Sequence, residues 1–511
     1  RETNISDHSI ACLPGCDVSR WLTRGGFQWQ DSSVVVERSV ERILWFEPIW
    51  DRLVKKEDAE NSFSSAPVNS VLAFSLSEKW KKGEFKGTDG NVNWSAKTKL
   101  DLKPGASSTH LIAIVGEALG SAPSSENICS RLASKAAMLQ KNGDWNKALE
   151  KGKTLWTGFL QKVPKLKTEW PENIQRHYFK SWTVPFYNLI PATNLGHVNL
   201  RHPSVMCNRI AHGGFTVPAS WEAALGALML SYVMPDTAAE IIEGIYSSAD
   251  EDGFIAEMIG GTRHTQLAYI EPCIALACVR NGAEPAFLNR SWELMRRHFV
   301  YRMHHPNWRH MSNVSLRNTA YNYYSAKGMV ALAKLLGRPS SEIARFEKGA
   351  KDAAIAVNAF WNEKDGGFHG YYDHIRREFV PGGDAESFIT LAGAAMPEKR
   401  RQLLEIMRNH YLTENGAIRA YPVGLESVKA PNKKLANTIL KCSNYFHVMP
   451  ALHQHDPVLA RKVAIGTVQT IAVDGDFYEQ QTLQGLGINN GPGSIFGAFG
   501  VVWPMMAVDG L

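Results

Sequence analysis

The sequence predicts a ring of paired helices, a helical toroid, preceded by an antiparallel β-sandwich-like domain. Three observations support this prediction. Residues 1–120 contain short apolar stretches separated by turns, as antiparallel strands do. From residue 127 onward, apolar positions recur three and four residues apart, which indicates helices. No strand pattern alternates with these helices, and this excludes a parallel α/β sheet.

The strands are expected at the most apolar or alternating stretches of the N-terminal region. These are residues 33–46, 70–76, 96–102 and 109–115, the last two being separated by the turn Pro104-Gly105. Residues 116–125 are rich in small residues, which indicates a linker. We therefore expect a β domain at residues 1–122 and a helical domain at residues 123–511.

About thirteen helices are expected in the second domain, from residues 127–140 and 144–162 through to 494–507. Several have start signals, namely Ser220 before Trp221, Pro235-Asp236, and Ser340-Ser341. No period of about 30 to 45 residues repeats, which counts against a plain repeat solenoid and leaves a toroid.

Composition is that of a soluble globular enzyme, with 44% hydrophobic and 21% charged residues and enough Trp and Tyr to line a sugar cleft. The net charge of +6 is scattered without a basic stripe, so no nucleic-acid partner is expected. No run of about eighteen apolar residues occurs, so no membrane partner is expected either.

The seven cysteines suggest no metal or redox motif, since only Cys12 and Cys16 lie close together, and whether they are bridged is left open. Histidines at 304, 305, 310, 453 and 455 lack metal-ligand spacing, and no nucleotide loop occurs, so no metal and no cofactor are expected. The chain opens with Arg1 rather than Met. A secreted or periplasmic protein is expected, with a cytoplasmic one and the oligomeric state left open.

Function is expected in the polar and Gly-rich connections between helices, because such loops gather at one end of a toroid. The sequence offers five of them: residues 211–222, 250–257 with 264–266, 310–324, 382–386, and 474–479 with 485–487 and 496–503.

The order of these loops resembles the catalytic domain of glycoside hydrolase family 63 and the trehalases over most of residues 125–511. That family has a Trp-Asp pair, an Asp-Gly-x-Ile turn, a Gln, an Asp-x-Ser-x-Arg loop and a late Tyr-Glu. This sequence has, in the same order, Trp221-Glu222, Asp252-Gly253-Phe254-Ile255, Gln266, Asn313-x-Ser315-x-Arg317 and Tyr478-Glu479. The resemblance implies an (α/α)6 barrel and an inverting hydrolase of an α-linked glucoside or related α-glycoside.

The resemblance also implies the roles of individual residues. Asn313 stands where the family has its general acid, and an amide cannot deliver a proton at neutral pH, so either this copy is disabled or another carboxylate acts. Glu479 would be the general base that activates a water. The expected substrate-binding residues are Trp221, Glu222, Gln266, Arg317, Tyr478 and Asp252. Glu257 and Glu386 are further carboxylates of these loops for which a structural or solvated role is the alternative.

Two departures from the family pattern leave other functions open. Residues 442–450 replace a Trp-x-Gly-Pro segment, so the pocket that selects the sugar is rebuilt, and Glu222 replaces an Asp and could have taken over the acid's role. One alternative is a polysaccharide lyase or sugar epimerase, with His212, His264 and Tyr324 as candidates. The other is a glycan-binding relative without catalysis.

Overall fold

A computed structural model describes the strands of residues 1–120 and most of the chain from Ser125 to Asp509. Within the second range, the residues not described are 195–198, 207–217, 257–258, 260–268, 305–307, 311–312, 365, 374–375, 381–384, 426–429, 431–432, 442–443, 476, 479 and 489–494. For some strand and helix residues, Asn313 among them, only the backbone is described.

The described elements form two compact units. Unit 1 comprises Arg1–Trp45, Ala59–Thr157 and Asn194–Asn199, and unit 2 comprises Phe46–Asp58, Gly158–Thr193 and Leu200–Leu511. Each unit is described by itself below. The domain boundary expected at residue 122 remains a proposal, namely that residues 1–122 and 123–511 fold independently of each other.

Unit 1 contains a four-stranded antiparallel sheet in the order β11-β6-β5-β4. Its strands are β4 (Phe27–Gln30), β5 (Ser33–Val40), β6 (Val68–Leu76) and β11 (Ile112–Gly120). The smaller sheets pair β1 (Glu2–Thr3) with β10 (Ser107–Ser108), β2 (Ile10–Cys12) with β9 (Leu100–Leu102), and β3 (Gly15–Val18) with β8 (Asn93–Lys97) and β7 (Lys81–Lys86). Antiparallel strands are confirmed at residues 33–40, 70–76 and 112–115, whereas residues 41–46 lie outside the described residues. The stretch 96–102 is divided between β8 and β9, which belong to different sheets.

One strand runs further than the sequence pattern predicted. β11 continues to Gly120, into the stretch expected to be a linker, because Gly116 and Ala118 pair with Leu72 and Ser70 of β6. Small residues weaken the strand signal in a sequence, but their backbone groups form the ladder as any others do.

A helix packs on one face of this four-stranded sheet. Helix α2 (Glu126–Asn142) begins after Ser125, whose hydroxyl accepts a hydrogen bond from the backbone N–H of Ile128. Its buried residues Cys129, Leu132, Ala133 and Ala136 form one stripe and share a core with Ala73 and Val115 of the sheet. The sandwich arrangement therefore stays a prediction. Helix α3 (Trp145–Leu160) follows α2.

Unit 2 is mainly helical, and its helices fall into two sets. The first set, here called the ring segments, contacts in a closed cyclic order: α5 (Ser220–Ser231), α7 (Glu271–Arg280), α9 (Leu316–Leu335), the 3-10 helix η2 (Ala385–Ala392), α13 (Tyr445–His455), α15 (Ile495–Asp509) and α5 again.

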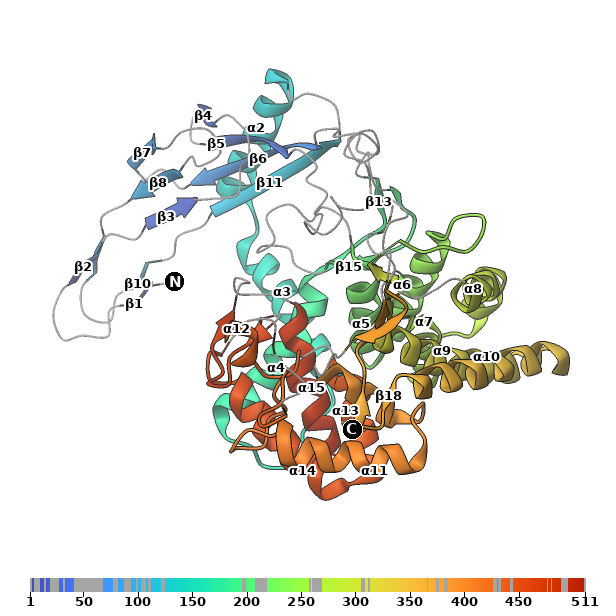
Figure 1. Ribbon diagram of the computed structural model, residues 1–511. Coiled ribbons are helices and arrows are strands. Elements are labelled where there is room, and N and C mark those ends of the chain that lie inside the picture. The colour runs from blue at the N-terminus through green and yellow to red at the C-terminus, as the bar shows by residue number, and fades with distance from the viewer. Residues whose placement is uncertain are drawn as a thin grey trace. The chain divides into compact units, whose positions relative to one another are not determined.

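The second set alternates with the ring segments along the chain and packs against them. It comprises α4 (Glu172–Tyr187), α6 (Pro235–Ser247), α8 (Ala286–His304), α10 (Ser340–Ala359), α11 (Pro397–Ile406) with its π-helical continuation η3 (Met407–Tyr411), and α14 (Pro457–Ile471). Figure 1 shows one such pair, α9 with α10 running alongside it. A short helix, α12 (Lys433–Ala436), precedes α13.

Burial differs between the ring segment α5 and the second-set helix α10. Every residue of α5 is buried, as expected of a helix that is surrounded on all sides. Helix α10 instead buries a single stripe, Phe346, Gly349, Ala350, Ala353 and Val357, on the side that faces α9 and side chains of α8. Helix α5 therefore lies in the core of unit 2.

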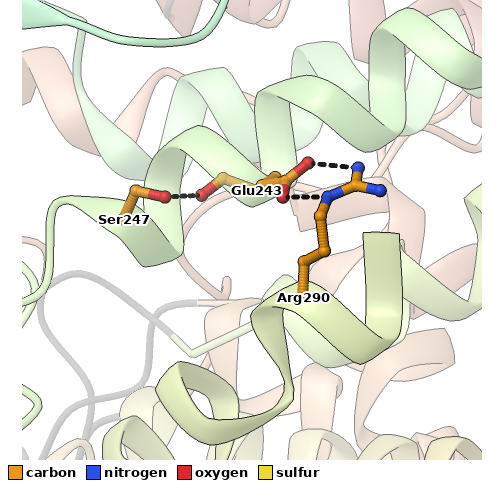
Figure 2. Close-up of polar contacts among 3 residues, drawn as sticks. All are labelled: Glu243, Ser247 and Arg290. Carbon is orange, nitrogen blue, oxygen red and sulfur yellow. Dashed lines mark hydrogen bonds and ion pairs between the residues drawn. The ribbon is translucent and has the colours of Figure 1, made fainter. Parts of the chain in front are cut away.

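Two helices of the second set, α6 and α8, also contact each other through a pair of charged side chains. Figure 2 shows Glu243 of α6 accepting two hydrogen bonds from the guanidinium of Arg290 on α8, both at 2.8 Å. The Arg290 hydrogen bonds, opposed by burial, keep the pKa of Glu243 below its usual value. The pair joins α6 to α8 at their surface.

Short strands also occur between the helices, and the expectation of helix after helix without strands was wrong in this respect. The largest group is the four-stranded sheet β16 (Trp308–His310), β17 (Asn313–Ser315), β20 (Tyr371–Asp373) and β21 (Glu378–Val380). Strands of two or three residues are too short for an alternating pattern to show in a sequence.

The remaining pairs are β12 (Leu189–Ile190) with β15 (Ser204–Val205), β13 (Thr193–Asn194) with β14 (Asn199–Leu200), β18 (Trp361–Asn362) with β19 (Gly367–Phe368), and β22 (Gln480–Gln481) with β23 (Gly487–Ile488). Every pairing of known register in the described residues is antiparallel.

Helix starts agree with the sequence to within one or two residues. Ser220 and Ser340, expected as caps, are the first helical residues instead, after Ala219 and Pro339. Among the described residues, none of the helices has both the length and the apolar character needed to span a membrane.

Candidate functional site

Three of the ring segments bring charged and polar side chains together at their first turns. Arg317 of α9 donates a hydrogen bond from Nη1 to Glu386 Oε1 of η2 at 2.9 Å. Asn444, the residue before α13, donates from Nδ2 to the same oxygen at 3.4 Å. The Arg317 and Glu386 side chains are only 14% and 12% exposed, so water competes little for this contact. A guanidinium at hydrogen-bond distance favours the ionised form of a carboxyl group. We call these three residues the Glu386 cluster.

Aromatic rings lie beside this cluster. The ring of Trp221 from α5 contacts those of Tyr321 and Phe446, with centroids 5.2 and 6.1 Å away, and Tyr321 stacks with Phe446 at 6.4 Å. Burial raises the pKa of the Tyr321 hydroxyl, the nearby Arg317 charge opposes this, and the Glu386 charge adds to it. Tyr321 is four residues after Arg317 and therefore lies on the same face of α9.

Strand pairing positions the residue at the expected acid position. The backbone of Asn313 pairs with His310 of β16 and Asp373 of β20. The strand ends at Ser315, whose hydroxyl caps α9 by accepting a hydrogen bond from the backbone N–H of Asn318 at 3.2 Å. Asn313 thus lies on a paired strand four residues before Arg317, rather than in an irregular loop.

A buried polar contact holds both ends of the segment that carries Asn313. Arg302, near the end of α8, donates from Nε and Nη2 to Asn322 Oδ1 on α9, at 3.4 and 3.2 Å. Asn322 Nδ2 in turn donates to the backbone carbonyl of Arg302 at 3.3 Å. The guanidinium of Arg302 also lies 5.6 Å from the ring centre of Tyr269. These contacts fix the spacing of α8 and α9 around the segment between them.

The predicted site residues that the structure describes lie in different surroundings. Arg317 contacts Glu386, and Trp221 contacts Tyr321, which lies on the same helix as Arg317. Glu222 is 6% exposed in the first turn of α5. Asp252 is exposed, and its carboxylate accepts a hydrogen bond from the backbone N–H of Phe254 at 3.4 Å, as a turn residue does.

Tyr478 packs against a glycine. Its ring lies so close to Gly487 that a Cβ atom there would be 2.3 Å from it. The remaining candidates, Glu479, Gln266, Glu257, His212 and His264, lie outside the described residues. Tyr324, the third residue of the lyase or epimerase alternative, is 8% exposed and its hydroxyl donates to the backbone carbonyl of Ile389. That hydroxyl therefore has a structural partner.

Sequence reasoning gave Glu386 no more than a secondary place and missed Tyr321, Phe446 and Asn444. Tyr321 carried a signal, because it is four residues after Arg317 and therefore on the same face of α9. Asn444 lies in the stretch 442–450 that departs from the family pattern, but nothing in the sequence pointed to its contact with Glu386, which spans 58 residues. Among the described side chains, no group of three or more His, Cys, Asp or Glu is arranged to hold a metal ion.

Comparison with known proteins identifies the fold. No protein-family model matches the sequence, and no curated protein sequence matches it either. Among solved structures, a GH63 mannosylglycerate hydrolase of Thermus thermophilus in complex with glucose superposes with a TM-score of 0.50 at 12% identity, covering 64% of this chain and 99% of its own. An uncharacterized conserved protein of the same organism superposes with the same values. At this identity the likeness concerns the fold alone.

Proposed function

We propose that this chain is an inverting glycoside hydrolase of an α-linked glucoside or a related α-glycoside, built on an (α/α)6 toroid. The observation that carries the proposal is the Glu386 cluster beside Trp221, at the first turns of ring segments that contact in a closed cycle. Carboxylate, guanidinium and amide groups can hydrogen-bond to sugar hydroxyls, and the neighbouring aromatic faces offer an apolar surface for a sugar ring. The fold likeness to a family 63 hydrolase supports the same reading.

In this proposal Glu479 is the general base and position 313 is that of the general acid. Inversion requires two carboxyl groups about 6.5–9.5 Å apart, so that a water fits between the base and the sugar. Arg317 is four residues after position 313 and would orient the acid. Trp221 would stack on a sugar face. Glu222, Gln266, Tyr478 and Asp252 remain proposed substrate-binding residues.

Activity assays on position 313 test the proposal. With Asn at 313 the protein should bind its sugar and turn it over slowly, since loss of a general acid costs about 10²–10⁴ in rate. Asn313→Asp should restore hydrolysis of aryl and natural α-glycosides, with inverted anomeric configuration by NMR, and adding Glu479→Gln should abolish it. Asn437→Asp, the same change at an exposed position, is the control and should have no effect.

Two outcomes would contradict the assignment. Full activity with Asn at 313, or retention of configuration, would mean that another carboxylate such as Glu222 is the acid. The amide at 313 favours a second candidate, a glycan-binding protein without catalysis. That candidate predicts sugar binding in both forms and hydrolysis in neither.

A further inference from the structure

The Glu386 cluster includes buried polar atoms that the protein itself does not satisfy. In the described part of the chain, neither the Tyr321 hydroxyl nor Asn444 Oδ1 has a protein hydrogen-bond partner, although both side chains are fully buried. Buried polar atoms are nearly always hydrogen-bonded in native proteins. Two such atoms beside one ion pair indicate a place where another polar group is bound.

The two atoms belong to the same small region. Asn444 reaches Glu386 through its Nδ2, so its Oδ1 is on the same amide group. Tyr321 is four residues after Arg317 on the same face of α9, and its ring stacks with that of Phe446, two residues after Asn444. These atoms come from two ring segments, α9 and the start of α13, that flank η2.

The carboxylate of Glu386 is the hydrogen-bond acceptor that the other members of the cluster share. Arg317 and Asn444 both donate to its Oε1. An ionised carboxylate only accepts hydrogen bonds, and those from hydroxyl groups to it are short and strong. The group it recognises must therefore carry donors, as sugar hydroxyls do.

We propose that Glu386 is the carboxylate that recognises the hydroxyl groups of the sugar ring, with Asn444 Oδ1 and the Tyr321 hydroxyl as neighbouring hydrogen-bonding atoms. The inference rests on the proposed function and assigns sugar selection to these residues. It also gives a role to residues 442–450, where the sequence departs from the family pattern, because Asn444 lies within them.

Calorimetric titration tests the proposal with methyl α-D-glucopyranoside and its monodeoxy derivatives as probes. Glu386→Gln keeps the shape and removes the charge, and should weaken binding of the parent glycoside about 10- to 100-fold. The loss should vanish for the derivative that lacks the recognised hydroxyl, as in a double-mutant cycle. Tyr321→Phe should weaken binding a few-fold while thermal unfolding stays unchanged.

Glu243→Gln is the matched control. It makes the same change in another carboxylate paired with an arginine, Arg290, on helices α6 and α8 (Figure 2), and should leave sugar affinity unchanged. Equal losses in this control, or equal losses of Glu386→Gln across all deoxy derivatives, would overturn the proposal. If Glu386→Gln does not fold, unchanged affinity of Tyr321→Phe for every probe would overturn it as well.

The experiment separates the two levels of inference. Absence of binding by the unaltered protein to every probe would contradict the proposed function. Binding by the unaltered protein that Glu386→Gln leaves intact would contradict only the role of Glu386.

Discussion

Buried ionisable side chains gather around Tyr269 in unit 2. His298 lies with its ring centre 4.9 Å from that of Tyr269, and the guanidinium of Arg302 lies over the same tyrosine ring. Burial lowers the pKa of His298 to about 3, the Arg302 charge adds to this, and the hydrogen bond with the Gly253 carbonyl opposes it. His298 is therefore neutral in the folded protein, with its Nδ1–H donating to Gly253 at 2.6 Å.

This neutral histidine predicts a pH dependence of stability. Between the unfolded pKa of about 6.5 and the folded value near 3, the unfolded chain binds a proton that the folded chain does not. Stability is therefore complete above pH about 6.5 and falls as the pH is lowered through this window. In His298→Gln, melting temperatures measured from pH 7 to pH 4 should decline less than in the unaltered protein.

A nearby buried glutamate changes the stability in the opposite direction as the pH is lowered. Each variant is therefore compared with the unaltered protein at every pH. Burial raises the pKa of Glu271 to about 7, so its contribution is present at low pH and is lost as the pH rises towards 7. The difference between each variant and the unaltered protein isolates the histidine. His453→Gln, at an exposed position, is the control, and an equal flattening there would contradict the role of His298.

At the level of helices, the end of α15 is tied to the chain segment before α4. Asp509 accepts hydrogen bonds from the backbone N–H of Thr168 at 2.7 Å and from Trp170 Nε1 at 3.2 Å. Asp509 and Trp170 are 4% and 7% exposed, so water does not replace these bonds easily. One carboxylate thus joins residues about 340 positions apart in the sequence.

Asp509→Ala should lower the free energy of unfolding by about 1–3 kcal/mol, because it leaves two donors without their acceptor. The measurement is the urea midpoint, read by tryptophan fluorescence. Asp509→Asn keeps one acceptor oxygen and should cost less. Equal losses in both variants would mean that the negative charge, rather than hydrogen bonding, stabilises this contact.

Glycine allows α14 to approach a neighbouring turn closely. A Cβ atom at Gly466 would lie 2.2 Å from the carbonyl oxygen of Asn415, and backbone atoms there cannot move aside cheaply. Gly466→Ala should therefore destabilise the protein by about 1–3 kcal/mol. Gly152→Ala on α3 meets nothing within 4 Å and should stabilise it by up to about 1 kcal/mol. Thermal unfolding of both variants checks the opposite signs.

Across the chain, the division into units predicts how fragments behave. Helix α2 lies after the domain boundary expected at residue 122, yet its buried stripe packs on β5, β6 and β11 of unit 1. In a fragment of residues 123–511, this apolar stripe loses its partner. Hydrogen exchange should then be fast in α2 and slow in α9, whereas both are protected in the full chain. Protection of α2 in the fragment would show that it folds without the sheet.

The sequence by itself determined many local elements and pointed to part of the candidate site. Periodic apolar positions predicted helices such as α2 and α10 to within a few residues, because spacing decides which side chains share a face. The motifs also pointed to Trp221 and Arg317, which lie in first turns of ring segments. The strand around Asn313 was missed, because three residues are too few to show a period.

Only the tertiary structure decided what these residues contact. Arg317 meets Glu386 across 69 residues of sequence, and Asn444 reaches the same carboxylate across 58. No local pattern encodes such pairs, since they depend on which helices are neighbours and on how far each is turned about its axis. The packing of α9, η2 and α13 is therefore what places a carboxylate, a guanidinium and an amide in one cluster.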